Sequence, residues 1–286
     1  MRPVRIVTKK PLEGSSRTRG FQLAGHLQNL GVDVSVIKQD IVEIEPIKNA
    51  IIVFVKHFDI DLVELAKENN NLIIWNPIDS FAVNKPLPPV GLFDGVIFPT
   101  SQALEDFGYL CKNPIGSLVI DSFADLRWRP AKCWRFQIAY LGTRKNIAEC
   151  YKGIRGLKFE FIHTNDGKKH ERFFKRASHY VCHFSVWEKD TPSFLYKPNT
   201  KLVGAAASDA NIVLSKSPSH YDILDSDYPY FTDTDIDSVQ EIVKFARSTY
   251  KAKEWKKGLR MLSEVREATS PKRIANKYAG YFLRFE

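Results

Sequence analysis

Short apolar runs and amphipathic segments alternate along the first half of the chain. Runs bounded by turn residues are typical of strands, and continuous apolar runs are typical of strands covered on both faces of a sheet. They predict strands at residues 3–8, 32–37, 50–55, 71–75, 94–99 and 117–120, and helical spacing predicts helices at 15–30, 60–69 and 101–110. Gly31 is placed to end the first helix. This order of elements predicts a parallel, doubly wound sheet with right-handed crossovers.

The pattern stops at residues 121–135, a charged and aromatic segment interrupted by Pro130, and then starts again. The second half predicts strands at 136–141, 157–163, 180–184 and 211–214, and helices at 200–207, 236–250, 254–267 and 271–283. The fold class is therefore expected to be α/β, with two tandem Rossmann-like domains and a helical C-terminus. We predict the domains at 1–130 and 131–286, because the pattern breaks and restarts between them. Ligands of such sheets bind outside the carboxyl ends of the strands, so the loops after the strands are the candidate sites.

Composition narrows the classes of function. No apolar stretch reaches the length of about 18 residues that a transmembrane helix needs, so the expected compartment is the cytoplasm. The formal charge of +9 favours anionic partners, but the basic residues are interspersed with acidic ones. We find no RRM, KH, zinc-finger or helix-turn-helix signature, so nucleic acid is not an expected partner. Peripheral contact with an anionic membrane stays open.

Cofactor and metal motifs are missing from the sequence. No GxGxxG follows a predicted strand, which disfavours a nicotinamide-binding Rossmann enzyme. The four cysteines are scattered, with no CxxC pair and no histidine at metal-ligand spacing. We therefore expect neither a cofactor nor a metal site.

Three segments resemble group-1 glycosyltransferases, the glycogen-synthase-like superfamily with the GT-B fold. In the strongest, residues 196–224, YKPNTKLVGAAASDANIVLSKSPSHYDIL is similar to the family's K-P-x-x-K-L segment, small-residue helix, apolar strand and small-residue loop. Residues 140–142 (YLG) resemble the first strand and turn of the family's donor domain, and residues 14–37 resemble its opening loop, first helix and second strand. The resemblance implies a compact, divergent member whose two domains face each other across a cleft.

One feature departs from the family. Many members carry two acidic residues at a fixed spacing, and the second contacts the ribose of the donor. Aligning the small-residue helix places Gly204 at that second position, and Glu188 does not restore the spacing. The identity of the donor and the stereochemical outcome therefore stay open, as does activity itself.

The resemblance implies a donor site in the second domain. Transfer from a nucleotide-diphosphate sugar leaves a diphosphate, whose charge backbone N–H groups at a helix start, Lys and Arg can stabilise. The implied donor-binding residues are Gly142, Thr143, Arg144, Lys145, Lys197, Asn199, Thr200, Lys201, Ser217, Ser219 and His220. We predict that Ser219 caps the helix after the loop 215–220. The same residues also fit ordinary helix caps and solvated lysines.

The first domain is then expected to bind the acceptor, a glycan or a lipid-linked molecule. The candidate acceptor-binding residues at the start of the first helix are Ser15, Ser16, Arg17 and Arg19. An inverting transferase also needs a base. His57 and Asp79 each follow an apolar strand, and Asp79 is preferred because an aspartate recurs there in similar sequences. An aspartate after Asn-Pro is equally typical of a turn.

The predicted function is a metal-independent, hexosyltransferase-like glycosyltransferase that uses a nucleotide-diphosphate sugar. Two alternatives stay open. One is a non-catalytic GT-B-like subunit that binds a nucleotide-sugar or a partner, which the missing acid favours. The other is a nucleotide-sugar epimerase on the same fold.

Overall fold

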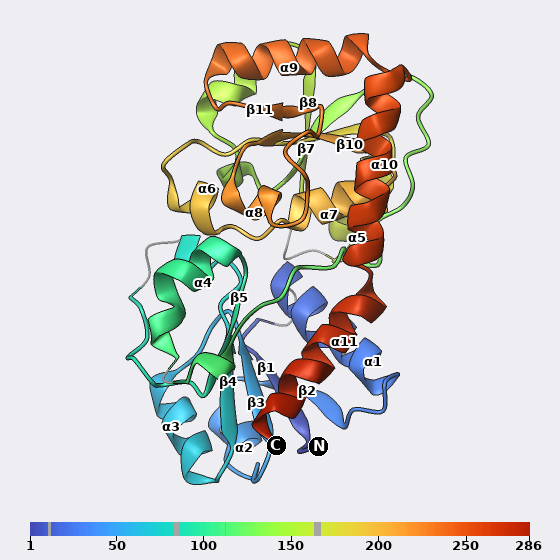
Figure 1. Ribbon diagram of the computed structural model, residues 1–286. Coiled ribbons are helices and arrows are strands. Elements are labelled where there is room, and N and C mark those ends of the chain that lie inside the picture. Colours follow the sequence, from blue (N-terminus) through green and yellow to red (C-terminus); the bar gives the residue numbers. More distant parts are fainter. Residues whose placement is uncertain (11–12, 83–85, 112, 163–166) are drawn as a thin grey trace. The chain divides into compact units, whose positions relative to one another are not determined.

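The computed structural model describes residues 1–286 except 11–12, 83–85, 112 and 163–166. The described chain forms two compact units, each built on its own parallel sheet (Figure 1). Unit 1 contains Met1–Ser122, Tyr196–Pro198 and Pro271–Glu286, and unit 2 contains Phe123–Leu195 and Asn199–Ser270. The predicted domain boundary after residue 130 stays a prediction, because grouping by packing does not test which segments fold independently.

The sheet of unit 1 has six parallel strands in the order β2-β1-β3-β4-β5-β6. They are β1 (Val4–Thr8), β2 (Val34–Lys38), β3 (Ile51–Val55), β4 (Leu72–Asn76), β5 (Gly95–Phe98) and β6 (Ser117–Val119). Every residue of β3 and β5 is buried, which explains why their sequences do not alternate. The predicted parallel, doubly wound sheet is confirmed.

Helices cover both faces of this sheet. They are η1 (Ser16–Gln22), α1 (Leu23–Gln28), α2 (Ile41–Ile44), α3 (Ile60–Glu68), η2 (Ser80–Ala82), α4 (Ser101–Phe107), η3 (Gly108–Leu110), η4 (Pro114–Gly116), α11 (Pro271–Phe282) and η7 (Leu283–Phe285). The connections from β1 to β2 and from β3 to β4 run in opposite directions, so right-handed crossovers place their helices on opposite faces. Helix α1 packs with α11, and α2 packs with α3 (Figure 1).

The first predicted helix is a π-helix, η1, followed by α1. The wider i→i+5 turn of a π-helix shifts the register of the apolar stripe. Phe21, an apolar residue in this turn, is 47% exposed. Gly20 allows η1 to approach β1, because a Cβ there would lie 3.0 Å from Thr8 Cγ2. Gly31 ends the segment with a φ of +80°, as predicted.

The sheet of unit 2 has five parallel strands in the order β11-β10-β9-β7-β8. They are β7 (Ile138–Gly142), β8 (Leu157–Phe161), β9 (Cys182–Ser185), β10 (Asn211–Ser215) and β11 (Phe231–Thr232). Strand β11 was not predicted, because two residues are too short for a periodic signal. The predicted strand 157–163 ends at Phe161 as β8, and His163 lies outside the described residues.

Helices and short turns surround the second sheet. They are η5 (Arg144–Asn146), η6 (Glu149–Gly153), α5 (Gly167–Ala177), α6 (Pro192–Tyr196), α7 (Thr200–Ala207), α8 (Pro218–Tyr221), α9 (Ile236–Ser248) and α10 (Lys253–Ala268). The three C-terminal helices are confirmed, but the last of them, α11, belongs to unit 1. Along β7, Ile138 and Tyr140 pack into one apolar cluster and Ala139 and Leu141 into another, so the sheet is covered on both faces.

Candidate functional site

Lys201 lies at the carboxyl end of β7, in the first turn of α7. Its Nζ is 4.0 Å from the ring centroid of Tyr140 and 4.6 Å from that of Trp187. Two aromatic faces attract the ammonium group and hold it in one place. A Cβ on Gly142 would lie 3.2 Å from Lys201 Cε and 3.0 Å from Tyr140 Oη, so glycine gives the lysine room that a larger residue would reduce.

The ends of β9 and β10 join the same cluster. The backbone N–H of Trp187 donates to Ser215 Oγ at 3.3 Å. His220 Nδ1 lies 2.8 Å from both the Ser215 carbonyl oxygen and Ser217 Oγ. Burial lowers the pKa of His220 to about 4, and the charge of Lys201 adds to this shift. His220 is therefore neutral at pH 7, and Lys201 supplies the positive charge at these strand ends.

Four buried polar atoms near these strand ends have no hydrogen-bond partner within the described chain. They are Thr143 Oγ1, His183 Nε2, Ser185 Oγ and Asn199 Oδ1. Thr143 follows β7, His183 and Ser185 belong to β9, and Asn199 precedes α7. Burial lowers the pKa of His183 to about 3, so its ring is neutral. Because buried polar groups are nearly always hydrogen-bonded, these atoms mark a place where a polar ligand would find partners.

Gly204, where the family's second acid would fall, is packed against Trp128. A Cβ at this position would lie 2.9 Å from Trp128 Cε2 and 3.0 Å from Cζ2. The Trp128 ring also packs against Phe174 and His183, at centroid distances of 5.1 and 5.5 Å. A carboxylate side chain at 204 would therefore displace the indole.

A cavity of about 360 Å³ opens beside the ends of β10 and β11. Its lining residues are Lys189, Phe194, Lys216, Thr232, Asp233, Thr234 and Asp235. Lys216 Nζ pairs with Asp233 Oδ2 at 3.0 Å. Asp235 caps α9 by accepting from the Ser238 N–H at 2.8 Å, and this backbone hydrogen bond lowers the pKa of its carboxyl group. The cavity thus combines one aromatic ring with polar and charged groups.

The predicted donor residues do not all lie in this cluster. Lys197 is grouped with unit 1, whereas the others belong to unit 2. Arg144 and Lys145 are exposed in η5. The prediction that Ser219 caps the next helix is wrong: Ser219 lies inside α8, whose N-cap position is Ser217, since Pro218 begins the helix. Trp187 was missed, because an aromatic residue just after a strand carries no signal of its partner.

In unit 1, the two candidate bases follow neighbouring strands. His57 comes after β3 and Asp79 after β4, and the backbone N–H of Lys56 donates to the Asn76 carbonyl oxygen at 2.8 Å. Lys56 Nζ pairs with Asp79 Oδ1 at 3.1 Å. His57 Nε2 lies 3.7 Å from Glu13 Oε2. The carboxyl edge of this sheet therefore places a carboxylate beside an ammonium group and an imidazole beside a second carboxylate.

The backbone between these groups is strained. Lys56 has a φ of +66° and Ile78 a φ of +57°. The left-handed region is disfavoured for a β-branched residue such as isoleucine, and such conformations persist where the surrounding structure enforces them. Strain of this kind clusters at functional sites, and here it sets the direction in which the chain leaves β4 just before Asp79.

Arg19, one of the candidate acceptor ligands, is bonded inside unit 1. It is 4% exposed and donates to Tyr278 Oη at 2.7 Å, to the Ile120 carbonyl oxygen at 3.2 Å and to Ser122 Oγ at 3.0 Å. The Asn76 amide also donates to Tyr278 Oη, at 2.7 Å. These bonds favour a structural role for Arg19. Ser16 is buried, whereas Ser15 and Arg17 are partly exposed at the start of η1.

Outside the gaps at 11–12, 83–85, 112 and 163–166, no group of three or more His, Cys, Asp or Glu side chains is placed to hold a metal ion. Within that part of the chain, no helix combines the length and the apolar character that crossing a bilayer requires.

Comparison with known proteins identifies the fold. No protein-family model matches the sequence, and no curated protein matches it. Among solved structures, the chain is similar to sucrose-phosphate synthase from Thermosynechococcus elongatus, with a TM-score of 0.68 and 10% identity over 100% of this chain and 99% of that one. It is also similar to Anabaena HepE in complex with UDP and glucose, with a TM-score of 0.63 and 8% identity over 99% of this chain and 100% of that one.

A third similar structure is BGT of T4 phage in complex with UDP and Mn²⁺. Its TM-score is 0.59, with 12% identity over 98% of this chain and 99% of that one. Likeness at such low identity reports the arrangement of the backbone and not the chemistry. The chain therefore has the GT-B fold of the glycosyltransferases, with two Rossmann-like sheets and C-terminal helices.

Proposed function

We propose that this protein is a glycosyltransferase that moves a hexose from a nucleoside diphosphate sugar to an acceptor, without a metal ion. The observation that carries the proposal is Lys201, whose ammonium group lies between the faces of Tyr140 and Trp187 at the carboxyl end of β7. Ligands of open parallel sheets bind at this edge, and a positive charge there suits a diphosphate leaving group.

The polar atoms around Lys201 support an anionic ligand with several oxygens. Ser185 Oγ is a buried hydroxyl without a hydrogen-bond partner in the described chain, and Thr143 Oγ1 is another. A hydroxyl can donate to a phosphate oxygen, so a bound diphosphate would satisfy groups that are otherwise left unpaired. The start of α7 adds backbone N–H groups near the same place.

The cavity beside β10 and β11 supports a place for the nucleoside. Lys216 lines it and directly follows Ser215, whose hydroxyl belongs to the cluster around Lys201. Phe194 offers a ring against which a base can stack, and Thr232 and Thr234 offer hydroxyl groups. UDP is the nucleotide in the similar HepE and BGT structures, so uridine is the first nucleoside to test.

The acceptor is assigned to unit 1, with Asp79 as the base and His57 as the competing candidate. Both follow strands at the carboxyl edge of that sheet. In an inverting reaction the acceptor oxygen attacks the anomeric carbon, the bond from that carbon to the diphosphate breaks, and the base takes the acceptor proton. Asp79 Oδ1 lies 3.1 Å from Lys56 Nζ, and a carboxylate oxygen is the group that takes the proton.

A thermal-shift panel of nucleoside diphosphates and nucleotide sugars tests the proposal. A ligand that binds only the native state raises the stability by mass action, by about 2.7 kcal/mol at a hundred times its Kd. We expect a uridine diphosphate sugar to raise the Tm more than the free sugar or uridine alone. If no ligand of the panel raised the Tm, the proposed donor site would be contradicted.

A non-catalytic nucleotide-sugar-binding protein is the second candidate. The packing of Gly204 against Trp128, which excludes the acid that many relatives carry, favours it. A donor that raises the Tm but is neither hydrolysed nor transferred to any acceptor would support this alternative. Release of free nucleoside diphosphate would exclude it.

A further inference from the structure

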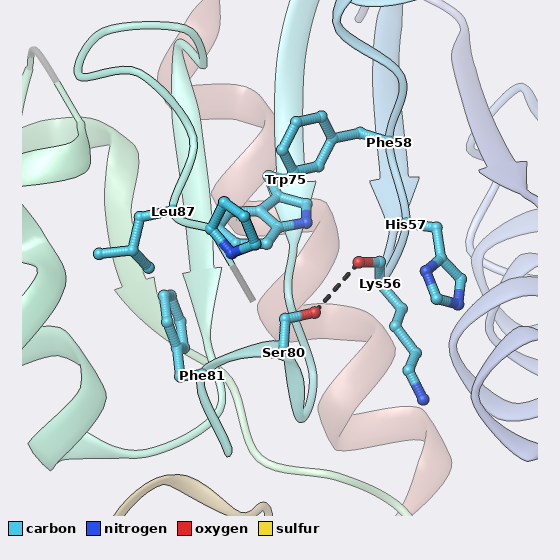
Figure 2. A pocket seen from close by; sticks show the side chains of 8 residues that line it. Lys56, His57, Phe58, Trp75, Ser80, Phe81 and Leu87 are labelled. Carbon is cyan, nitrogen blue, oxygen red and sulfur yellow. Dashed lines mark hydrogen bonds between the residues drawn. The ribbon is translucent and has the colours of Figure 1, made fainter. Parts of the chain in front are cut away.

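A second cavity lies within unit 1, beside the carboxyl ends of β3 and β4 (Figure 2). Its volume is about 160 Å³. Its lining residues are Lys56, His57, Phe58, Trp75, Ser80, Phe81, Pro86 and Leu87. The cavity thus adjoins His57, and through Lys56 it adjoins Asp79, which pairs with that lysine at 3.1 Å.

The wall of the cavity is mainly aromatic and aliphatic. Phe58 and Phe81 each meet the Trp75 ring edge to face, with ring centroids 5.4 Å apart in both pairs. Figure 2 shows Phe81 and Leu87 on one side of the cavity and Lys56 and His57 on the other. Rings arranged in this way favour a further flat ring, which finds both faces and edges to contact.

The size of the cavity fits one such ring. An engineered apolar cavity of about 150 Å³ in another protein stays dry and binds benzene. The cavity beside β3 and β4 is of similar volume, at about 160 Å³. A sugar ring would lose the hydration of its hydroxyl groups against Phe58, Phe81 and Leu87, which is unfavourable.

One polar atom in the wall lacks a partner. Trp75 is 3% exposed, and its buried Nε1 has no hydrogen-bond acceptor among the described residues. In Figure 2 this nitrogen lies on the side of the ring toward Lys56 and His57. The Ser80 hydroxyl, in contrast, already donates to the carbonyl oxygens of Lys56 and Pro77. A buried indole N–H without a partner is destabilising unless a ligand supplies an acceptor.

We infer that this pocket, lined by Phe58, Trp75, Phe81 and Leu87 and with the unpartnered Trp75 N–H in its wall, binds one aromatic ring that carries an oxygen acceptor. The inference rests on the proposed function in one respect, because it takes the ring to be part of the molecule that accepts the transferred sugar. The acceptor is then a phenol-like or aryl-substituted alcohol, held by its ring beside His57 and Asp79, rather than a plain glycan.

Binding of small probes tests the pocket without any transfer reaction. We would titrate the full chain with 4-methylphenol, toluene, 1-hexanol and methyl glucoside, and follow each probe by saturation-transfer NMR. The expected order of affinity is 4-methylphenol, then toluene, with no saturable binding of methyl glucoside. One neutral hydrogen bond corresponds to about 2–12-fold in affinity, so toluene should bind weaker than 4-methylphenol by a factor in that range.

Two variants locate the binding. Trp75→Phe keeps a ring but removes the N–H, so it should lower the affinity for 4-methylphenol to that for toluene and leave toluene unchanged. Leu87→Asp places a charge at a lining residue that is 42% exposed, so it should weaken both probes without unfolding the protein. Leu30→Asp is the matched control, because Leu30 is a comparably exposed leucine of unit 1 that does not line the pocket.

Several outcomes would overturn the inference. The first is no saturable binding of 4-methylphenol, and the second is equal weakening by Leu87→Asp and Leu30→Asp. The third is tighter binding of 1-hexanol than of 4-methylphenol, which would mean that the pocket binds an alkyl chain. Binding of UDP, measured on the same samples, separates this inference from the proposed function. UDP binding without 4-methylphenol binding would overturn only the aromatic subsite. The reverse result would overturn the donor site and the assignment of the ring to an acceptor, and would leave the aromatic pocket.

Discussion

The carboxyl edges of the two sheets share an architecture but carry different chemistry. In unit 2, Lys201 lies between two aromatic rings, and buried polar atoms near the same strand ends lack hydrogen-bond partners in the described chain. In unit 1, Asp79 is paired with Lys56, His57 lies near Glu13, and an apolar cavity adjoins them. One edge suits an anion, and the other suits proton transfer next to an apolar group.

The difference shows where the binding properties of this fold reside. Parallel strands place their carboxyl ends at one edge whatever their sequence, so the fold provides the location. The residues after each strand provide the chemistry: a small residue, Gly142, after β7 makes room for a lysine, whereas strained residues after β3 and β4 hold charged side chains. Each prediction below changes one edge and leaves the other intact.

The largest expected effect is a loss of turnover caused by a substitution in unit 1. Asp79→Asn should lower kcat by about 10²–10⁴-fold, the usual contribution of a positioned base, and leave donor affinity unchanged, because the donor is assigned to unit 2. Steady-state kinetics with donor affinity measured in parallel provide the test. His57→Gln is the matched variant for the competing base. Normal turnover in Asp79→Asn with a collapse in His57→Gln would transfer the role to the histidine.

The next largest effect is a loss of nucleotide affinity caused by a substitution in unit 2. Lys201→Ala should weaken binding of a nucleoside diphosphate by about tenfold or more, since a hydrogen bond to a charged group contributes about 1.5–3 kcal/mol. Isothermal titration calorimetry measures it directly. Lys244→Ala, at an exposed position of α9, is the control for the loss of one positive charge. Equal affinity of both variants for the nucleotide would remove Lys201 from the site.

A smaller effect concerns the stability of unit 2 in acid. Burial lowers the pKa of His183 to about 3 and of His220 to about 4, whereas the unfolded value is about 6.5. Between these values the unfolded chain binds protons that the native state does not, so the free energy of unfolding falls as the pH drops from about 6.5 toward 4.

Denaturant unfolding between pH 7.5 and 4.5 measures this dependence. Each histidine contributes a slope of up to about 1.4 kcal/mol per pH unit. In His183→Gln the slope should be shallower by up to that amount. Parallel pH profiles for the wild type and the variant would show that this histidine is not buried and neutral in the native state.

The smallest expected effect is that of chelation. Excess EDTA should leave the rate of transfer unchanged, because the proposal assigns the leaving-group charge to Lys201 and to backbone N–H groups. The measurement is the initial rate before and after chelation, and again after addition of Mn²⁺ or Mg²⁺. Loss of activity that either ion restores would mean that the edge of unit 2 needs more positive charge than Lys201 provides.

Strands could be predicted because their apolar runs are local signals, and ten of the eleven strands in the described part of the chain were predicted. Strand β11 and helix α5 were missed: the first has two residues, and the second, GKKHERFFKRA, is mostly charged and has few apolar positions. The π-helical turn of η1 was also missed, since an apolar stripe of normal spacing says nothing of a wider turn.

The candidate site could be predicted only in part. The resemblance singled out Gly142 and Lys201, and the structure places them side by side. It could not indicate that Trp187 packs against the lysine. This is a tertiary contact between two different elements, and hydrophobic periodicity reports only the local structure of each. The aromatic cavity of unit 1 was missed for a similar reason: Pro86 and Leu87 come from a loop without a pattern.

The position of α11 has a consequence for synthesis. Tyr278, Tyr281 and Phe282 are almost fully buried in unit 1, yet they follow every residue of unit 2 in the sequence. The nascent chain therefore contains every residue of unit 2 before it contains all of unit 1, although unit 1 begins first. Until α11 emerges, the guanidinium group of Arg19 lacks its Tyr278 partner, and the apolar face of α1 lacks its cover. Of the two units, unit 1 begins first in the sequence and is completed second.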